Sequence, residues 1–408
     1  MTQATEVLPA TRASETRLVA SVCLAHLVSH YYIVLLAPLF VFIRADYGVT
    51  YTELAFALTF FHLVSTVLQT PAGFLIDRTD ARLNLVGGLM LGASAIAVAG
   101  LVDSFLVFIA MFGVLGIANT VFHPADYSLL STHVPQERLT KAFSYHTCAG
   151  MAGSAIAPVT LLFMQDLVGW RGAFLGASIF GFIAALVVLL QREPPVERPH
   201  RAAPLQDREP AKEPGDGWKL LLSAPILLNF AFFIALSMVS DGLNQFLVVG
   251  LVALHNTPLA LANSALTVLL TMIAVGVLVG GIVAARTPRH NLVAGCGLLV
   301  TGLVSAAIGQ WDPGVLLLFA LVTLSGLATG ITMPSRDMIV RSVTPHGSFG
   351  KVFGFVSTGL HVGGVISPLI FGQLLDHGQP RFVFFFIAAC AMVAVAIVSF
   401  SALVRRPV

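Results

Sequence analysis

Residues 116–158 read GIANTVFHPADYSLLSTHVPQERLTKAFSYHTCAGMAGSAIAP, and residues 326–368 read GLATGITMPSRDMIVRSVTPHGSFGKVFGFVSTGLHVGGVISP. The two stretches align without a gap at a spacing of 210 residues (326 minus 116). Glycine frees the backbone and proline restricts it, so their recurrence in register indicates that two halves share one helical scaffold. The matched pairs are Gly116 and Gly326, Pro124 and Pro334, Pro135 and Pro345, Phe143 and Phe353, Gly153 and Gly363, Pro158 and Pro368, and Arg171 and Arg381. The chain is therefore predicted to be an internal duplication.

The composition excludes a soluble globular protein. Of the 408 residues, 57% are hydrophobic and 10% are charged, whereas soluble domains carry about 25% charged residues. The cysteines lie in apolar segments without a CxxC pair, which indicates small core side chains rather than disulfides or metal ligands. The first apolar run begins at Leu18 and is too long for a cleaved signal peptide, so we interpret it as a membrane helix.

Twelve apolar runs are long enough to cross a bilayer, whose core takes ~20 residues of helix. They cover residues 18–42, 52–76, 83–102, 105–130, 140–165, 172–191, 220–252, 260–285, 291–310, 314–338, 350–375 and 381–404. The longest connection is polar, rich in proline and of mixed charge, which is typical of a flexible linker. We therefore predict an all-α membrane protein with twelve transmembrane helices. Two six-helix bundles, residues 1–191 and 220–408, are joined by a linker at residues 192–219.

The distribution of Lys and Arg predicts the orientation of the chain, because cytoplasmic loops carry an excess of both. With the N-terminus in the cytoplasm, 18 of the 22 basic residues lie on the cytoplasmic side or in the linker. The outer loops hold Arg44, Arg171 and Arg381, and Arg336 lies inside a helix. Both termini are therefore predicted to be cytoplasmic, in a multi-pass protein of the cell inner (plasma) membrane.

The segment between the second and third expected helices resembles the loop signature of the major facilitator superfamily. It reads GFLIDRTDAR from Gly73 to Arg82, with Asp80 and Ala81 where that pattern prefers a glycine and a basic residue. Gly169-Trp170-Arg171 is another feature shared with the superfamily, and the resemblance covers essentially the whole chain. It implies the major facilitator fold and a gate that uses the side chains of the loop. The gate residues so implied are Gly73, Asp77, Arg78 and Arg82.

Two further resemblances concern the direction of transport. Phe122-His123-Pro124 and His30 resemble the fosmidomycin-resistance-like branch of the superfamily, which implies an exporter. Gly150, Gly153 and Pro158 partly resemble the glycine-rich motif of its antiporters. The simpler interpretation of these small residues is that they let the fifth and eighth helices approach closely. We favour this packing interpretation and take antiport as the alternative.

Polar residues at helical spacing form stripes on four expected helices. Ionisable groups are costly in hydrocarbon, so each is a functional candidate. The first, fourth, seventh and tenth helices of the superfamily fold line a central cavity, and the stripes fall on those helices. Their members, with one further histidine, are His26, His30 and Tyr31; Asn119, His123, Asp126 and Tyr127; Ser237, Asp241, Asn244 and Gln245; Thr329, Thr332 and Arg336; and His361. We predict that they bind substrate or protons, and we assign His62 and His146 to structural roles.

Asp126 and Arg336 occupy equivalent positions in the two halves, which favours an ion pair between the halves that closes an inner gate in the outward-facing state, with Asp337 as a further gate residue. Local pairing is an equally good interpretation, with Asp126 on Arg138 or Lys141, and Asp337 on Arg336 or Arg341. Histidine titrates near neutral pH and burial favours a neutral carboxyl group, so His30, Asp126 and Asp241 are candidates for a coupling proton. We prefer Asp241 for the proton and His30 with Tyr31 for substrate.

The sequence disfavours the other classes of membrane protein that we considered. His26 and His30 have the spacing of a metal-chelating pair on one helix, but there is no second such pair, no HExxH motif and no carboxylate cluster nearby in sequence. We therefore expect neither an enzyme, nor a bound metal or other cofactor. The chain has no Walker motif, which disfavours direct ATP hydrolysis. It also has no large extramembrane domain, the usual mark of a receptor. Twofold repeats favour a transporter with alternating access over a channel.

The prediction is a monomeric secondary transporter, coupled to protons, that exports a small polar or anionic solute and binds no nucleic acid. Arg336 and the histidines favour an anion over a lipophilic cation. The alternatives are proton-linked uptake of an organic anion, and multidrug efflux of lipophilic cations.

Overall fold

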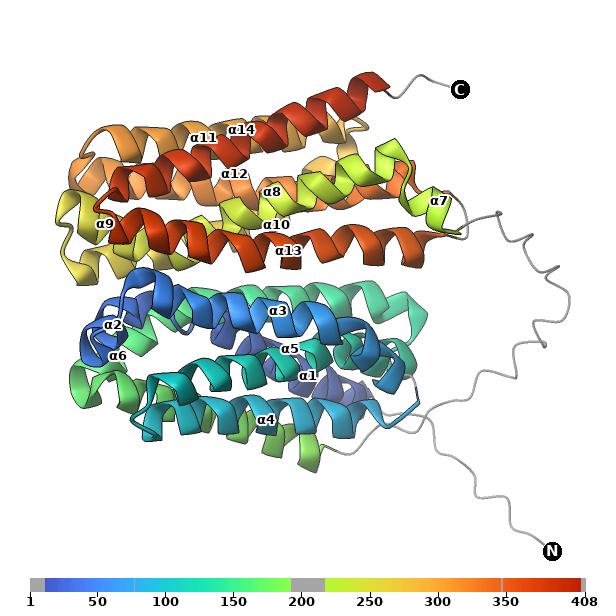
Figure 1. Cartoon of the computed structure of the whole chain (residues 1–408). Helices are drawn as coiled ribbons and strands as arrows, with labels where there is room; N and C mark the ends of the chain where they lie inside the picture. Colours follow the sequence, from blue (N-terminus) through green and yellow to red (C-terminus); the bar gives the residue numbers. More distant parts are fainter. Residues whose placement is uncertain (1–11, 77, 192–216, 346–347, 405–408) are drawn as a thin grey trace, which may run out of the picture.

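The computed structural model describes residues 12–76, 78–191, 217–345 and 348–404. The described elements are helical throughout and run back and forth along one axis (Figure 1). They are α1 (Arg12–Ile33), η1 (Ala37–Leu39), α2 (Phe40–Tyr47), α3 (Tyr51–Ile76), α4 (Ala81–Leu101), α5 (Phe105–His133), α6 (Gln136–Leu190), α7 (Gly217–Leu221), α8 (Ala224–Gln245), α9 (Leu247–His255), α10 (Leu259–Arg286), α11 (His290–Gln310), α12 (Gly314–Val343), α13 (Phe349–Asp376) and α14 (Pro380–Val404).

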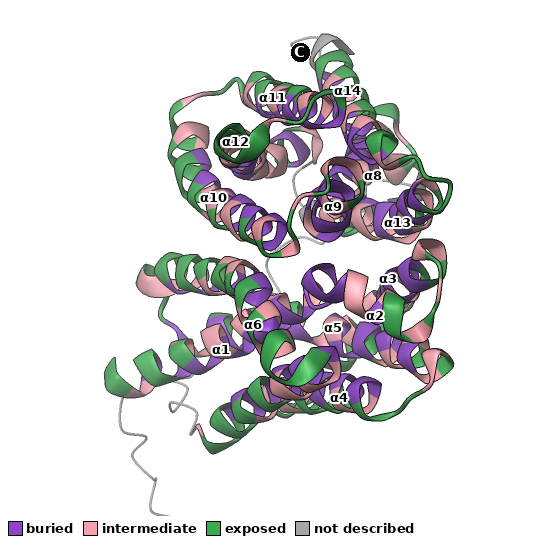
Figure 2. Ribbon diagram, turned by 90° about the vertical axis from the view of Figure 1, so that its left-hand side faces the viewer, coloured by how far each residue is buried: buried purple, intermediate pink, exposed green. Residues whose placement is uncertain are grey.

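The helices form two bundles, α1–α6 and α7–α14, that lie against each other in Figure 1. Helix α1 begins and α14 ends at the same end of the molecule, which we call the terminal end; the opposite end, which carries α2 and α9, is the distal end. Two pairs of helices join the bundles, α3 with α13 and α6 with α10, as the view along the axis shows (Figure 2). The linker predicted at residues 192–219 lies mostly outside the described residues.

Eleven helical segments are long and apolar enough to cross a membrane. One of them, α6, has 55 residues, which at ~1.5 Å per residue is more than twice the ~30 Å of a bilayer core. Gly169 interrupts it with φ 73° and ψ 171°, so α6 consists of two helices joined at this residue. Glycine has no Cβ, and therefore takes this left-handed φ without steric cost.

The duplicated stretch lies on equivalent helices of the two bundles. Pro124 is inside α5 and Pro334 inside α12, while Pro158 is inside α6 and Pro368 inside α13. Two expected boundaries differ. The expected helix over 18–42 gives way to a 3-10 turn beginning at Ala37, where Pro38 lacks the N–H of a continuing helix. The expected helix over 220–252 is divided between α8 and α9 at Phe246.

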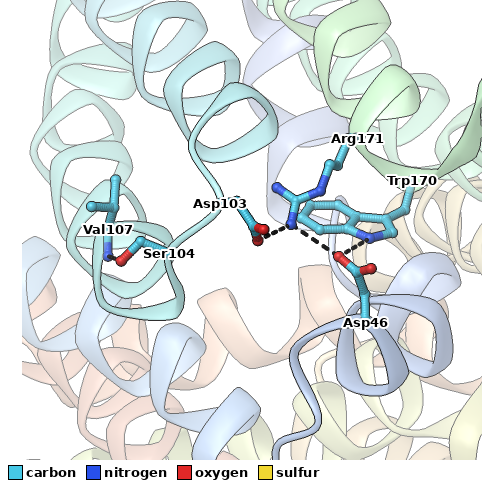
Figure 3. A network of polar contacts seen from close by, with 6 residues as sticks. All are labelled: Asp46, Asp103, Ser104, Val107, Trp170 and Arg171. Carbon is cyan, nitrogen blue, oxygen red and sulfur yellow. Dashed lines mark hydrogen bonds and ion pairs between the residues drawn. The ribbon is translucent and has the colours of Figure 1, made fainter.

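An arginine network closes the distal end of the first bundle (Figure 3). Arg171 Nη2 donates to Asp46 Oδ2 at 2.9 Å and to Asp103 Oδ1 at 2.6 Å, and Trp170 Nε1 donates to the same Asp46 oxygen at 3.2 Å. The guanidinium carbon lies 4.5 Å from the Trp170 ring centre. These contacts tie α2, the loop before α5 and the second part of α6 together. The Gly169-Trp170-Arg171 segment therefore has a structural role here.

Candidate functional site

Four histidines and one aspartate gather inside the first bundle. His26 and His30 come from α1, His123 and Asp126 from α5, and His146 from α6. His146 Nε2 is hydrogen-bonded to Asp126 Oδ2 at 2.9 Å, and His26 Nδ1 lies 3.4 Å from the same oxygen. The imidazole rings of His26 and His146 stack with their centroids 3.6 Å apart. Three helices that are distant in sequence thus place their polar groups around one carboxylate. We call these five residues the histidine cluster.

The cluster is buried on one side and open on the other. Asp126 is 0% exposed, His146 1% and His26 3%. His123 is exposed, although its ring centroid lies 5.0 Å from that of His26 and 6.4 Å from that of His146. His123 therefore lies on the side of the cluster that is open to the surroundings, and this is the side from which a ligand can reach Asp126.

Two buried polar atoms of the cluster have no hydrogen-bond partner among the described residues, Asp126 Oδ1 and His26 Nδ1. Unpaired polar atoms are costly at this depth, and a buried carboxylate without a cation is costlier still. The described residues offer Asp126 two imidazoles and no Lys or Arg partner. The geometry therefore favours a positive ligand at Asp126.

Glycines of α6 allow this close assembly. A Cβ at Gly150 would lie 2.7 Å from the His26 ring, and one at Gly153 would lie 2.0 Å from the Leu27 carbonyl oxygen. These glycines thus pack against α1, whereas we expected them to pack the fifth helix against the eighth. The expectation was wrong because Gly150 and Gly153 are on the face of α6 that points into its own bundle. The cavity-lining residues Met151 and Ala155 are on the face toward α10.

The expected ion pair between Asp126 and Arg336 is absent from this conformation. Asp126 is bound by the histidines, and Arg336 Nε donates to its neighbour Asp337 Oδ1 at 2.9 Å. The Arg336 guanidinium carbon also lies 5.0 Å from the centre of the Phe233 ring. The local pairing of Arg336 with Asp337 is the alternative that we kept open, and it is the one observed. Asp126 has neither of the local partners expected for it, because His146 reaches it from the next helix.

Asp241 lies in the second bundle, between α8 and α13. Its Oδ2 accepts a hydrogen bond from the Ser367 hydroxyl at 2.7 Å, and Ser237 donates to the Leu360 carbonyl at 2.5 Å. The sequence analysis missed Ser367, because no spacing within α8 reveals a partner from α13. Gln245 Nε2, expected to contact substrate, instead donates to the Ile33 carbonyl of the first bundle at 2.9 Å. Its neighbour Asn244 is partly buried, and its side-chain oxygen has no partner among the described residues.

We expected Tyr31 to lie beside His30 and to contact substrate, but its side chain points into the bundle interior. Its hydroxyl is 2.8 Å from Thr160 Oγ1, and its ring meets Phe180 edge-on in the bundle interior. Consecutive helical residues point about 100° apart, so His30 and Tyr31 cannot face the same space. His30 Nδ1 lies 3.4 Å from Ser154 Oγ.

The other candidates lie on different surfaces. Tyr127 is 47% exposed and its ring centroid lies 6.0 Å from that of His123, so it lines the open side of the cluster. Asn119 Nδ2 donates to Ser65 Oγ at 3.5 Å within the first bundle. His361 is partly buried on α13. His146 is buried and binds Asp126, and His62 lies between the bundles, where it packs against Gly364. Both contacts agree with the structural roles expected for these histidines.

The residues of the proposed gate loop make contacts within the first bundle. Arg82 Nε donates to the Val188 carbonyl at 2.9 Å, and its Nη2 donates to the Leu189 carbonyl. Arg78 is exposed, and a Cβ at Gly73 would meet nothing within 4 Å. Asp77 lies outside the described residues. Arg82 therefore fastens the start of α4 to the end of α6.

A cavity of about 1120 Å³ opens between the bundles in the half of the molecule nearer the terminal end. Its walls are mainly apolar residues of α6 between Thr140 and Ile156 and of α10 between Thr271 and Arg286. In the distal half, hydrogen bonds hold the bundles together. Asp376 accepts from the backbone N–H groups of Tyr51 and Thr52 at 2.7 and 2.8 Å, and Thr59 donates to the Val365 carbonyl at 3.1 Å. The two bundles are thus held together at the distal end and separated at the terminal end.

Curated proteins with similar sequences are transporters. The D-galactonate transporter of Escherichia coli O6:H1 is 22% identical over 363 residues, 81% of this chain and 82% of that protein. The fosmidomycin resistance protein of Escherichia coli K12 is 22% identical over 371 residues, 90% and 88% of the two chains. A shorter match, 27% over 144 residues, covers 35% of this chain and 32% of the probable L-galactonate transporter of Escherichia coli K12.

Solved structures show the same fold. A bacterial homolog of the human lysosomal transporter Spinster, in an inward-facing and occupied conformation, has a TM-score of 0.78 at 14% identity, covering 96% of this chain and 97% of that one. The family model described as Major Facilitator Superfamily matches residues 22–252 and again residues 234–408. This match confirms the resemblance noted in the sequence and excludes an enzyme. The chain belongs to the Major Facilitator Superfamily, whose members transport small solutes across membranes.

Proposed function

We propose that the chain is a proton-coupled secondary transporter of the inner membrane, which moves a small polar or anionic solute by alternating access, most simply as an exporter. The division of α6 at Gly169 supports twelve membrane crossings from the eleven apolar segments. The excess of Lys and Arg at the terminal end supports cytoplasmic termini. On this orientation the bundles are joined on the outer side and parted on the cytoplasmic side, which corresponds to an inward-facing state.

The observation that carries the substrate class is a partly exposed arginine on α12, together with two exposed polar side chains on α5. Arg336 contributes a cation from α12 with a side chain 20% exposed, and the exposed His123 and Tyr127 contribute hydrogen-bonding groups from α5. A partly exposed arginine in a membrane-spanning helix attracts carboxylates and phosphates strongly, because its planar guanidinium can donate to two oxygens. Uptake of an organic anion is the second candidate, and the relationship to a D-galactonate transporter favours it.

We assign the coupling proton to Asp241. Its carboxylate lies deep in α8 and accepts a hydrogen bond from Ser367, with no basic partner among the described residues. An acid at that depth without a cation is a site where a proton binds and leaves during the transport cycle. The two bundles, with the linker at residues 192–219, move as the units of this cycle.

Proteoliposomes that contain a pH-sensitive dye test this function. Sugar acids, other organic anions and lipophilic cations are added one at a time, and solute-driven movement of protons is recorded. We expect a response to anions that Asp241→Asn abolishes, while exchange of labelled solute for unlabelled solute survives. Arg336→Gln should abolish both activities and Arg336→Lys should retain part of each. A response to lipophilic cations that does not need Arg336 would overturn the assignment.

A further inference from the structure

We propose that His26, His146 and Asp126 form a binding site for a divalent transition-metal ion of the zinc class, with a fourth coordination position facing His123. Each of the three residues offers one ligand atom, a ring nitrogen or a carboxylate oxygen, and these atoms all lie within 4.8 Å of one another. Imidazole nitrogen and carboxylate oxygen are ligands that suit zinc and neighbouring ions, and three protein ligands leave one position open. This proposal goes beyond the transport function, and it holds whatever the solute is.

The separations fit a tetrahedral ion. Zinc lies ~2.0–2.1 Å from its nitrogen and oxygen ligands, so two ligands at a tetrahedral angle are about 3.3 Å apart. The two nitrogens lie 2.9 and 3.4 Å from Asp126 Oδ2. An ion would replace the proton held between His146 and Asp126. Because the rings of His26 and His146 are stacked with their centroids 3.6 Å apart, both imidazoles must rotate so that a nitrogen of each points at the ion.

The two unpaired atoms of the cluster favour an ion over a proton alone. A proton on the Asp126–His146 pair serves one hydrogen bond and leaves both His26 Nδ1 and Asp126 Oδ1 without a hydrogen-bond partner among the described residues. A metal ion accepts electron pairs from His26 and His146 and from one or both oxygens of Asp126 at once. It therefore satisfies all the buried polar atoms that converge on this point.

The exposure of His123 and the net charge of the metal site determine which ligand occupies the fourth coordination position. His123, with its ring centroid 5.0 Å from that of His26, is exposed and is close enough to supply a fourth nitrogen. A dication with one carboxylate and neutral imidazoles leaves a net charge of +1 in a medium of low dielectric constant. Such a charge attracts an anion, so an anionic oxygen from water or from a solute can occupy the position in place of His123.

The chelating pair suggested by sequence spacing is different from the one that the fold assembles. His26 and His30 are one turn apart on α1, but His30 Nδ1 lies beside Ser154 and takes no part in the three-ligand set. His146 and Asp126 come instead from α6 and α5. No second histidine pair and no carboxylate cluster lies near His26 and His30 in the sequence, but the tertiary structure brings both kinds of ligand to His26 from other helices.

Cobalt binding tests the proposal directly. The full chain is purified through a tag without histidines, treated with a chelator and titrated with Co²⁺, whose visible absorption is strong in tetrahedral sites. We expect one equivalent of intensely absorbing Co²⁺, displaced by one equivalent of Zn²⁺. His146→Gln and Asp126→Asn should weaken binding by more than the ~10–100-fold caused by loss of an outer-shell partner. The matched control is His361→Gln, a membrane histidine of the other bundle, which should bind Co²⁺ like wild type.

A second measurement needs no variant, and so remains decisive if the substitutions impair folding. X-ray absorption of the zinc-loaded wild-type protein should show three or four nitrogen and oxygen ligands, at least two of them imidazoles. Absence of the tetrahedral cobalt spectrum, or a zinc shell without imidazoles, would overturn the proposal. Equal cobalt affinity in wild type and a folded His146→Gln would do the same. None of these readouts depends on transport, so the proposed function and this site can fail independently.

Discussion

Replacing Gly153 by alanine tests whether the contact between α1 and α6 holds the histidine cluster together. A Cβ at this position would lie 2.0 Å from the Leu27 carbonyl oxygen, whereas ordinary contacts of a Cβ begin near 3.4 Å. The two backbones must therefore separate by 1.4 Å (3.4 minus 2.0) or tilt by an equivalent amount. The obstacle is a backbone atom, so no side-chain rotation can relieve the clash.

Overpacking of this kind costs roughly 1–3 kcal/mol, and an obstacle made of backbone places Gly153→Ala toward the upper end of that range. The assay is thermal unfolding in detergent, together with Co²⁺ titration of the histidine cluster. The matched control is Gly87→Ala in α4 of the same bundle, where a Cβ meets nothing within 4 Å. Alanine favours a helix over glycine by roughly 1 kcal/mol, so the control should be neutral or stabilising. Equal melting temperatures for the two variants, with an unchanged cobalt site in Gly153→Ala, would refute the reasoning.

Three further substitutions test other contacts. Asp376→Ala removes three hydrogen bonds from Tyr51 and Thr52 between the bundles. Spin labels at the exposed positions Ala45 and Gln379 should therefore report more frequent opening of the distal end, and an unchanged distance distribution would contradict the contact described above. Arg171→Met breaks an exposed network, and since exposed ion pairs contribute roughly 0–1 kcal/mol each, we expect a small fall in melting temperature with transport retained. Tyr31→Phe removes the hydrogen bond to Thr160 and should cost roughly 0.5–1.5 kcal/mol of stability. Solute affinity should not change, and a clear loss of affinity would restore Tyr31 to the substrate site.

The class of fold could be read from the sequence because it depends on local properties. Twelve apolar runs reflect the preference of each segment for lipid, and the recurrence of Pro124 at Pro334 and of Pro158 at Pro368 reflects backbone geometry that each half needs. Neither signal requires knowledge of which helices touch. The glycine at residue 169 is visible in the sequence, but its left-handed conformation, which divides a 55-residue helix, is visible only in the structure.

The candidate site could be predicted only in part. Helical spacing correctly places His123, Asp126 and Tyr127 on one helix, but it does not reveal that His146 of α6 binds Asp126. The partner of a buried carboxylate depends on how neighbouring helices are rotated and how closely they approach, which is set at Gly150 and Gly153 by the absence of a side chain.

By itself, the sequence determined that this chain crosses a membrane repeatedly, that it is duplicated, and which superfamily it resembles. These properties follow from hydrophobicity and from the backbone demands of glycine and proline, which act residue by residue. Only the tertiary structure decided that His26, His146 and Asp126 converge, that Tyr31 faces the bundle interior, and that the bundles are joined at the distal end. Those facts depend on distances between helices, and the pattern along one helix carries no information about its rotation against another.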